Sequence, residues 1–105
     1  MEPSDAARAE ACSTLGIETS YADYKDALAN PEIDAVVIVT PTKYHCEIAL
    51  AAAAAGKHIL CEKPMAMTEE ECILMEEAAK KHKVKLQVAF MRRFDTSFVE
   101  AKRIV

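Results

Sequence analysis

The sequence predicts an α/β domain in which helices alternate with the strands of an open parallel sheet. Short apolar runs alternate along the chain with helical patterns of about 10 to 15 residues, the spacing typical of strand–helix–strand units. One run, residues 35–39, is apolar and β-branched throughout, as in a strand that is covered on both faces. Strands joined by helices pair in parallel through right-handed crossovers. We therefore expect a doubly wound parallel sheet.

Length and composition fit a small folded unit. The chain has 105 residues, of which 51% are hydrophobic and 29% charged, so it can build a core and does not have the composition of a disordered protein. A net charge of -4 gives no indication of a nucleic acid or an anionic membrane surface as a partner. No apolar run reaches the roughly 18 residues of a membrane span, and the polar N-terminus does not resemble a signal peptide.

The cysteines do not form a recognisable metal or redox motif. No two of them are spaced as C-x-x-C, and no cysteine–histidine cluster has the spacing of a zinc site. We expect free, mostly buried thiols and hence a reducing compartment, which predicts a cytoplasmic location. The cysteines are Cys12, Cys46, Cys61 and Cys72.

The N-terminal part predicts a helix and then a short strand. Residues 3–5 (Pro-Ser-Asp) are a typical helix start, and residues 6–15 are alanine-rich and favour a helix. Gly16 is expected to end this helix in the left-handed conformation. Residues 17–19 (Ile-Glu-Thr) are expected to form a short edge strand.

A second helix and the first buried strand follow. Asp23 is expected to cap a short helix that runs through Leu28, and the Asn-Pro pair at 30–31 breaks the pattern. Residues 35–39 then form the apolar strand, and Thr-Pro-Thr at 40–42 turns the chain.

The middle of the chain predicts a helix that packs closely on the sheet. Residues 44–55 form a helical pattern that ends at Gly56. Five alanines at 51–55 give this helix a small surface, so it can lie close to the strands. The second strand is expected at residues 58–61.

Thr68 and Glu71 have the spacing of a capping box, which predicts a helix that begins here and runs to about His82. Its buried stripe should contain Cys72, Met75 and Ala79.

The C-terminal part predicts a third strand and a last helix. Residues 85–90 have the composition of a strand, and residues 91–94 are expected to form a loop. Asp95 is then placed to cap a helix that runs to Val105.

Polar clusters follow each of the three main strands. They are Thr-Pro-Thr at 40–42 with Tyr44 and His45, Glu-Lys-Pro at 62–64, and Met-Arg-Arg at 91–93. The carboxyl ends of parallel strands share one edge of the sheet, which is where ligands bind in open α/β folds. Threonine hydroxyls and helix N-terminal amides can hold ribose or phosphate oxygens, a glutamate can accept from sugar hydroxyls, and a lysine can move a proton. The pattern predicts a nucleotide site at this edge.

Some of these residues also have plainer interpretations. His45 lies in the first turn of a helix, where a solvated or locally hydrogen-bonded ring is common. Glu62 and Lys63 could form a surface ion pair of little energetic value. Arg92 and Arg93 could be solvated charges. The position of Glu62 and Lys63 at a strand end favours the functional interpretation for that pair.

These residues resemble one family of oxidoreductases. The stretch AVVIVTPT at 35–42, His45, AGKH at 55–58 and Glu-Lys-Pro at 62–64 are similar to the Gfo/Idh/MocA family, which contains glucose–fructose oxidoreductase and inositol 2-dehydrogenase. The sequence FMRRFD at 90–95 resembles its inositol dehydrogenase branch. The resemblance covers nearly the whole chain.

The resemblance implies an N-terminal Rossmann domain that binds NAD or NADP. Lys63 is then the expected catalytic residue, and Glu62 and Lys63 are expected to contact the nicotinamide ribose. The Lys63–Pro64 bond is expected to be cis. The implied reaction transfers a hydride between the cofactor and a hydroxyl carbon of a sugar or cyclitol. The cofactor-binding residues are expected to be Thr40, Pro41, Thr42, His45, Glu62, Lys63, Pro64, Met91 and Arg92.

The chain departs from the family pattern at both ends. Its glycines, Gly16 and Gly56, both follow helices, so the sequence contains no G-x-G-x-x-G phosphate loop. The resemblance therefore implies an incomplete Rossmann domain that lacks the first strand–helix–strand unit and the C-terminal substrate domain. Residues 1–105 are expected to be the second half of the NAD(P)-binding domain, with residues 95–105 beginning the connection to the substrate domain.

These departures set expectations for the isolated chain. It should be inactive alone, although the full-length protein is expected to be a dehydrogenase and a homo-oligomer. The strand at 35–39 should present an unpaired apolar edge, which favours instability or association. An alternative hypothesis is a truncated, non-catalytic isoform that pairs with a full-length partner. A flavodoxin-like or receiver-type domain ranks last, because such domains carry acidic or phosphate-binding clusters at their strand ends.

Overall fold

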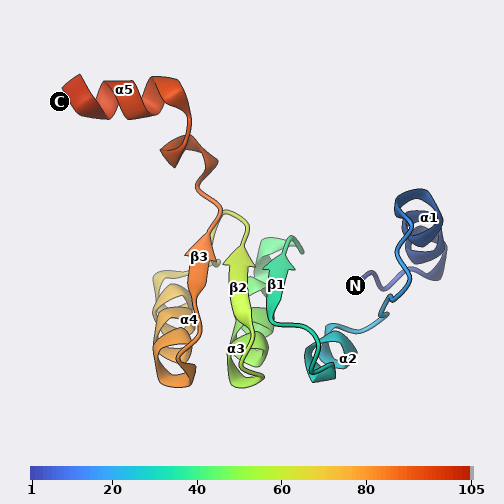
Figure 1. Ribbon diagram of the computed structural model, residues 1–105. Coiled ribbons are helices and arrows are strands. Elements are labelled where there is room, and N and C mark those ends of the chain that lie inside the picture. The colour runs from blue at the N-terminus through green and yellow to red at the C-terminus, as the bar shows by residue number, and fades with distance from the viewer. Residues whose placement is uncertain (105) are drawn as a thin grey trace.

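The computed structural model describes residues 1–104 and confirms an α/β fold of the Rossmann type (Figure 1). Its strands are β1 (Ala35–Ile38), β2 (His58–Cys61) and β3 (Leu86–Val88). They form a three-stranded parallel sheet in the order β1-β2-β3, as expected for consecutive strand–helix–strand units. The third strand is shorter than the predicted residues 85–90.

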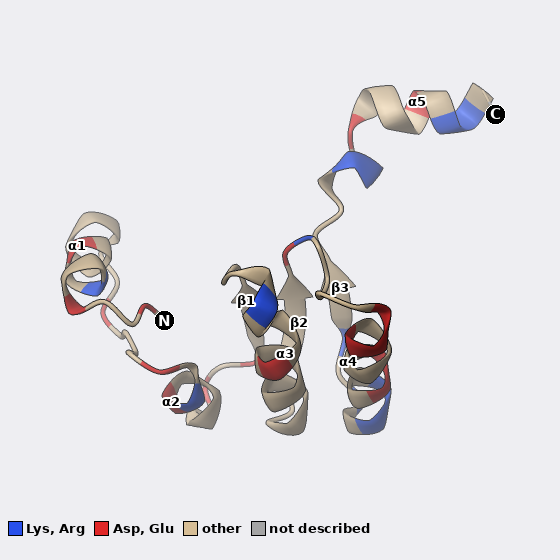
Figure 2. Ribbon diagram, turned by 180° about the vertical axis from the view of Figure 1, so that it is seen from behind, with Lys and Arg blue, Asp and Glu red and all other residues tan. Residues whose placement is uncertain are grey.

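The two crossover helices, α3 (His45–Ala54) and α4 (Glu69–His82), lie on the same face of the sheet (Figures 1 and 2). A short 3-10 turn, η1 (Thr42–Tyr44), leads from β1 into α3, so the predicted helix at 44–55 begins one residue late. Gly56 follows α3 in the left-handed conformation with φ 74°, as predicted.

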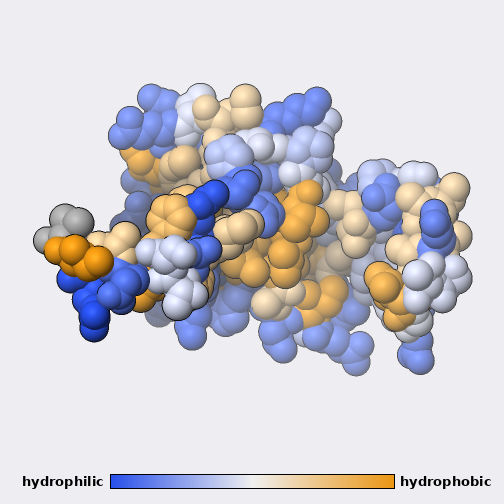
Figure 3. Space-filling view, turned by 90° about the horizontal axis from the view of Figure 1, so that it is seen from above, coloured by the Kyte–Doolittle hydropathy of each residue, from blue (hydrophilic) through white to orange (hydrophobic). Residues whose placement is uncertain are grey.

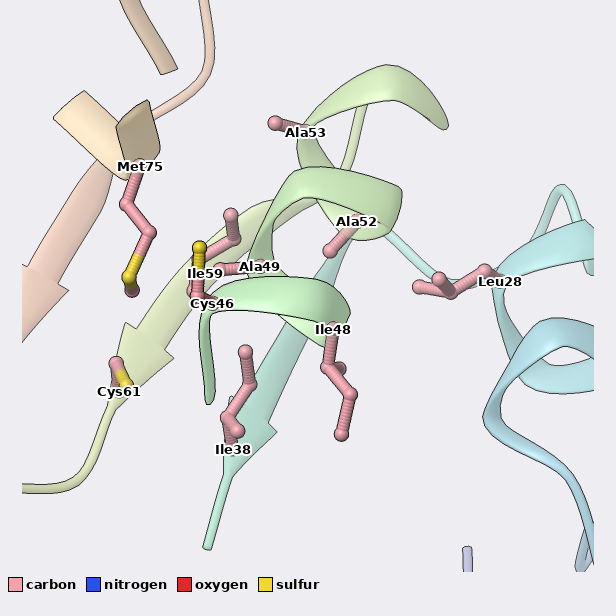
Figure 4. Packing of buried hydrophobic residues seen from close by; sticks show 10 residues of the cluster. All are labelled: Leu28, Ile38, Cys46, Ile48, Ala49, Ala52, Ala53, Ile59, Cys61 and Met75. Carbon is pink, nitrogen blue, oxygen red and sulfur yellow. The ribbon is translucent and has the colours of Figure 1, made fainter. Parts of the chain in front are cut away.

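The core lies between this face and the helices (Figure 4). Ala52 and Ala53 are 0% exposed, so the alanine run does let α3 approach the strands closely. Met75 of α4 is 1% exposed and closes the other side of the core. The buried cluster consists of Leu28, Ile38, Cys46, Ile48, Ala49, Ala52, Ala53, Ile59, Cys61 and Met75.

The opposite face of the sheet is not covered in the described part of the chain. Burial alternates along β1 and β2, and Val37 and Leu60 are 64% and 36% exposed. The prediction that residues 35–39 are buried on both faces is therefore wrong for residues 1–104. The physical reason is that no helix of these residues packs on this face, while α3 and α4 both pack on the other.

The N-terminal helix α1 (Asp5–Leu15) has the predicted caps but no buried residue. The Ser4 hydroxyl accepts from the Ala7 amide, and Gly16 ends the helix with φ 64°. The predicted edge strand at 17–19 is absent from the structure. The Ile17 amide instead donates to the Cys12 carbonyl and closes the helix, and no described strand pairs with these residues.

Two further helices have caps that the sequence predicts. Helix α2 (Tyr24–Ala29) begins at Asp23, whose carboxylate accepts from the Lys25 amide. In α4 the Thr68 hydroxyl accepts from the Glu71 amide, and the Glu71 carboxylate reaches back to the Met67 amide, one residue before the position expected of a capping box. Acidic residues at the start of α4 and lysines at its end match the helix dipole (Figure 2).

The C-terminal segment leaves the sheet and projects away from it (Figure 1). The predicted loop at 91–94 contains a 3-10 turn, η2 (Met91–Arg93). Helix α5 (Thr96–Ile104) follows and has no buried residue. Asp95 caps it through the Ser97 amide, and the predicted end at Val105 lies outside the described residues. Over the described chain, no helix combines the length and apolar character needed to cross a membrane.

Candidate functional site at the carboxyl edge of the sheet

The three strands end level with one another, which brings the predicted site residues to one edge. Ile38 pairs with Cys61, and Cys61 pairs with Val88. The strands point the same way, so the turns after them lie at the same end of the sheet (Figure 1). This is the edge at which parallel α/β folds bind ligands.

Glu62 and Lys63 are held at the end of the central strand. The Glu62 amide donates to the Ile38 carbonyl at 2.9 Å, which extends the pairing of β1 and β2 by one residue. The half-buried Glu62 carboxylate accepts from the Lys63 amide, also at 2.9 Å. This bond holds the carboxylate at the carboxyl edge of the sheet, where it can accept hydrogen bonds from the hydroxyl groups of a ligand.

The Lys63 side chain is exposed, and its bond to Pro64 is cis, as the resemblance implied. Within residues 1–104 the ion pairs are Arg8–Asp5, Lys80–Glu76 and Arg103–Glu100. The alternative of a Glu62–Lys63 surface ion pair is therefore not what the described chain forms. Lys63 is exposed to solvent, and it contacts the Glu62 carboxylate through its backbone amide.

Thr40, Pro41 and Thr42 form the turn after β1. Thr40 and Pro41 line a hollow of about 530 Å³ together with Tyr44 and Glu47. The Thr40 hydroxyl oxygen is buried and has no hydrogen-bond partner among the described residues. A buried hydroxyl without a partner is unfavourable, so this group is suited to a ligand oxygen or to water. Thr42 begins η1 and is half-buried.

His45 lies beneath the edge and not on its surface. The residue is 1% exposed, and its ring nitrogens face the Thr40 and Pro64 carbonyl oxygens. It therefore matches the locally hydrogen-bonded alternative more closely than a residue that lines a ligand.

Met91 and Arg92 face different surroundings. Met91 lines a shallow groove of about 240 Å³ with Glu62, Leu60 and Phe90. The Arg92 guanidinium instead lies over the Phe98 ring of α5, 4.8 Å from its centroid. The structure thus brings Met91 to the Glu62 turn and turns Arg92 toward the C-terminal helix.

Two features of the site were missed from the sequence. One is the apolar surface beside Glu62, to which the exposed side chains of Val37, Leu60 and Phe90 contribute; apolar surface also gathers near the middle of the view onto this edge (Figure 3). The sequence gives no signal of it, because the apolar run at 35–39 lacks the polar alternation that marks an open face.

The other feature is the buried thiol of Cys61, whose sulfur lies 3.4 Å from His45 Nδ1. Burial raises the pKa of this thiol from 9.0 to about 11, and the nearby Glu62 and Cys72 add to the rise. Burial also raises the pKa of Cys46. Thiols that stay protonated are poor nucleophiles, so we expect these cysteines to be unreactive. Both belong to the buried core beneath the site.

Comparison with known proteins identifies the family. The sequence profile of an oxidoreductase family with an NAD-binding Rossmann fold, Gfo/Idh/MocA, matches residues 1–90. The chain is 46% identical over 89 residues to the scyllo-inositol 2-dehydrogenase (NAD(+)) of Bacillus subtilis, which covers 85% of this chain and 26% of the relative. It is 43% identical over 97 residues to the levoglucosan dehydrogenase of Pseudarthrobacter phenanthrenivorans, covering 92% of this chain and 25% of the relative.

Solved structures show the same fold. The scyllo-inositol dehydrogenase of Lactobacillus casei, solved with bound NAD(H) and scyllo-inositol, aligns with a TM-score of 0.89 and 35% identity, covering 98% of this chain and 31% of that one. The myo-inositol 2-dehydrogenase of Lactobacillus plantarum aligns with a TM-score of 0.88 and 38% identity over the same shares. The chain spans about a quarter of the length of the curated relatives it matches. On its sequence, its fold and its strand-end residues, the chain belongs to the Gfo/Idh/MocA family of oxidoreductases with an NAD-binding Rossmann fold.

Proposed function

We propose that this chain forms the nicotinamide side of an NAD-dependent dehydrogenase that acts on a hydroxyl carbon of a sugar or cyclitol. The observation that carries the proposal is the Glu62–Lys63–Pro64 turn at the carboxyl end of the central strand, next to Met91 and opposite the Thr40–Pro41 turn. Relatives with 43–46% identity are named as levoglucosan and scyllo-inositol dehydrogenases, which favours a polyol or cyclic sugar as the substrate.

The residues present fit one half of a dinucleotide. The unpartnered Thr40 hydroxyl and the fixed Glu62 carboxylate offer a donor and acceptors for ribose hydroxyls. The apolar groove beside Met91 suits a flat ring. A glycine-rich phosphate cradle is not found in the sequence, whose Gly16 and Gly56 both lie at helix ends. The fit is therefore to the ribose and nicotinamide, with NAD favoured because relatives were solved with NAD(H) or NADH.

Each residue then has a separate task. Glu62 orients the ribose through its carboxylate, which the Lys63 amide holds in place. The exposed Lys63 follows it in the chain and takes the proton that leaves the reacting hydroxyl. A bound nicotinamide supplies the hydride-acceptor chemistry. For this transfer the substrate hydroxyl must bind within hydrogen-bond distance of the Lys63 amine, at the carboxyl edge of the sheet.

The test is Lys63→Ala in the full-length dehydrogenase. Because general acid–base groups typically contribute about 10²–10⁴-fold, we expect turnover to fall by about that factor while NAD affinity changes little. Lys81→Ala, which removes an exposed lysine of α4 far from the edge, is the matched control. Unchanged turnover in the Lys63 variant would rule out its catalytic role.

The proposed organisation is a partial cofactor domain within a longer protein. Residues 1–105 would be the second half of the NAD-binding domain, and residues 95–105 would lead into a substrate domain. The longer protein would be a cytoplasmic homo-oligomer. Calorimetric titration of the 105-residue chain with NAD, and with NADP in parallel, should give weak or no binding. Micromolar affinity for the isolated chain would contradict this division.

A second candidate function is a non-catalytic chain that pairs with a full-length partner. The open edge of β1 favours it, because Ala35–Ile38 pairs with β2 on one side and with no described strand on the other. Light scattering with and without the full-length protein separates the two candidates, since only the second predicts a mixed complex.

A further inference from the structure

His45 connects the two turns that carry the candidate site. It is the first residue of α3, and its side chain lies below the ends of β1 and β2 with 1% exposure. Ring atom Nε2 lies 2.7 Å from the Thr40 carbonyl oxygen, and Nδ1 lies 3.0 Å from the Pro64 carbonyl oxygen. The ring therefore spans the gap between the turn after β1 and the turn after β2.

The shorter contact fixes one end of the ring. A carbonyl oxygen can only accept and a neutral imidazole carries one N–H, so the shorter of the two carbonyl contacts assigns that proton to Nε2, which donates to the Thr40 carbonyl. At the other end Nδ1 has two neighbours, the Pro64 carbonyl at 3.0 Å and the Cys61 sulfur at 3.4 Å. Both neighbours belong to the end of β2 and the turn after it. With the proton on Nε2, Nδ1 can only accept, so its hydrogen-bond partner is the Cys61 thiol, and this bond holds the ring to the end of β2.

The buried position of His45 restricts the orientation of its ring. His45 is enclosed by the core, so its ring has no water to exchange with and little freedom to turn. The Cys61 thiol beside it stays protonated, since its pKa is raised to about 11. The distance between the Thr40 carbonyl and the Cys61 thiol at the end of β2 is then set by the width of one imidazole ring.

We propose that His45 is a positioning residue that sets the separation of the Thr40–Thr42 turn and the Glu62–Pro64 turn. It acts through these turns and does not touch the cofactor. The consequence for cofactor binding rests on the proposed function, because that function assigns both turns to the ribose and nicotinamide. The bridge itself is a property of the folded chain and can be tested without any ligand.

The first test is nitrogen-15 NMR of the histidine rings in the 105-residue chain. We expect one ring N–H signal, from Nε2 of His45, that exchanges slowly with water. His58 and His82 are exposed and serve as internal controls with fast exchange. A His45 ring whose Nε2 carries no proton, or whose N–H exchanges as fast as those of His58 and His82, would overturn the bridge.

The second test uses variants in the longer protein. His45→Phe keeps a ring of similar shape without nitrogens, and we expect NAD to bind at least about tenfold more weakly. His45→Gln can place an amide donor near the Nε2 position, so it should restore part of the affinity, whereas His45→Phe should not. Cys46→Ala changes the next buried residue of α3 and should leave NAD affinity unchanged.

The outcomes separate the two proposals. If the wild-type longer protein does not bind NAD but the protected N–H is present, the proposed function fails and the bridge stands. If His45→Phe binds NAD as tightly as wild type, or if His45→Gln restores nothing while its unfolding midpoint matches wild type, the positioning role fails. Where His45→Phe does not fold, the NMR result and the His45→Gln affinity decide.

Discussion

The two faces of the sheet differ sharply, although they are built from the same strands. On the face beneath α3 and α4, Ile59 is 4% exposed and Cys61 is 0% exposed. On the other face, Leu60, which lies between them in β2, is 36% exposed, and Val37 of β1 is 64% exposed. Neighbouring residues of one strand therefore experience a packed core and open solvent, because their side chains point in opposite directions.

This difference shows where the stability of the described chain originates. The hydrophobic effect stabilises side chains in proportion to the apolar area removed from water. Ile59 and Cys61, on the α3–α4 face, have nearly all of their apolar area removed from water, whereas Val37 and Leu60, on the open face, stay 64% and 36% exposed. The open face is apolar nonetheless, which is typical of a surface that another element covers in a complete doubly wound sheet.

The largest expected effect compares two adjacent residues of β2. Ile59→Ala should lower the free energy of unfolding by about 2–5 kcal/mol, because it removes buried methyl groups and leaves a cavity. Leu60→Ala should cost less than about 1 kcal/mol, since its side chain is partly in solvent already. Urea denaturation of both variants measures the contrast.

Equal losses at the two positions would show that the open face is covered in solution, by self-association for example. Repeating the urea experiment at several protein concentrations distinguishes that case, because only an associating chain has a concentration-dependent midpoint.

An intermediate effect is expected for overpacking on α3. Ala53→Leu adds bulk where the residue is 0% exposed, and it should destabilise the chain by about 1–3 kcal/mol. The next residue, Ala54, is exposed, so Ala54→Leu should change the stability by no more than about 0.5 kcal/mol. Thermal unfolding followed by circular dichroism compares them. If both leucines are tolerated equally, α3 does not lie as close to the sheet as the structure shows.

The smallest expected effect is in the alkaline pH dependence. The folded-state pKa of Cys61 is raised from 9.0 to about 11, chiefly by burial. Below about pH 9 the thiol is protonated in both states and its contribution to stability is complete. Between about pH 9 and 11 the unfolded chain loses this proton first, so the free energy of unfolding falls with rising pH.

Urea midpoints measured across this pH range should therefore fall more steeply in wild type than in Cys61→Ala. Alkylation with iodoacetamide adds a second reading. Leu60→Cys, on the open face, should react far faster than native Cys61, as mass spectrometry of the modified peptides would show. Equal pH slopes in wild type and Cys61→Ala would contradict the assigned burial.

Local signals in the sequence predicted most of the secondary structure. Ser4, Asp23 and Thr68 cap the helices that the sequence assigned to them, and Gly16 and Gly56 have the left-handed conformation. These features depend on a few neighbouring residues, so one sequence is sufficient to predict them. The parallel order of the strands also followed, because helical crossovers dictate it.

Features that depend on distant parts of the chain were predicted less well. Residues 17–19 have strand-like composition but no strand to pair with, and the apolar run at 35–39 does not reveal that one of its faces is open. At the site, Glu62 and Met91 do share a groove, yet Arg92 turns to Phe98 and His45 lies below the surface. Which way a side chain points depends on its tertiary neighbours, and the strand-end pattern cannot supply them.

The order β1-β2-β3 also has a consequence for how the chain folds. Every strand pairs with the next strand in the sequence, across one helix, so each pairing closes only a short segment of chain. Parallel pairings across a helix are non-local contacts, whose loop-closure cost comes before their gain, so we expect this sheet to form more slowly than the helices themselves. The two turns that carry the candidate site follow β1 and β2, so they are brought together only when this first pair of strands has formed.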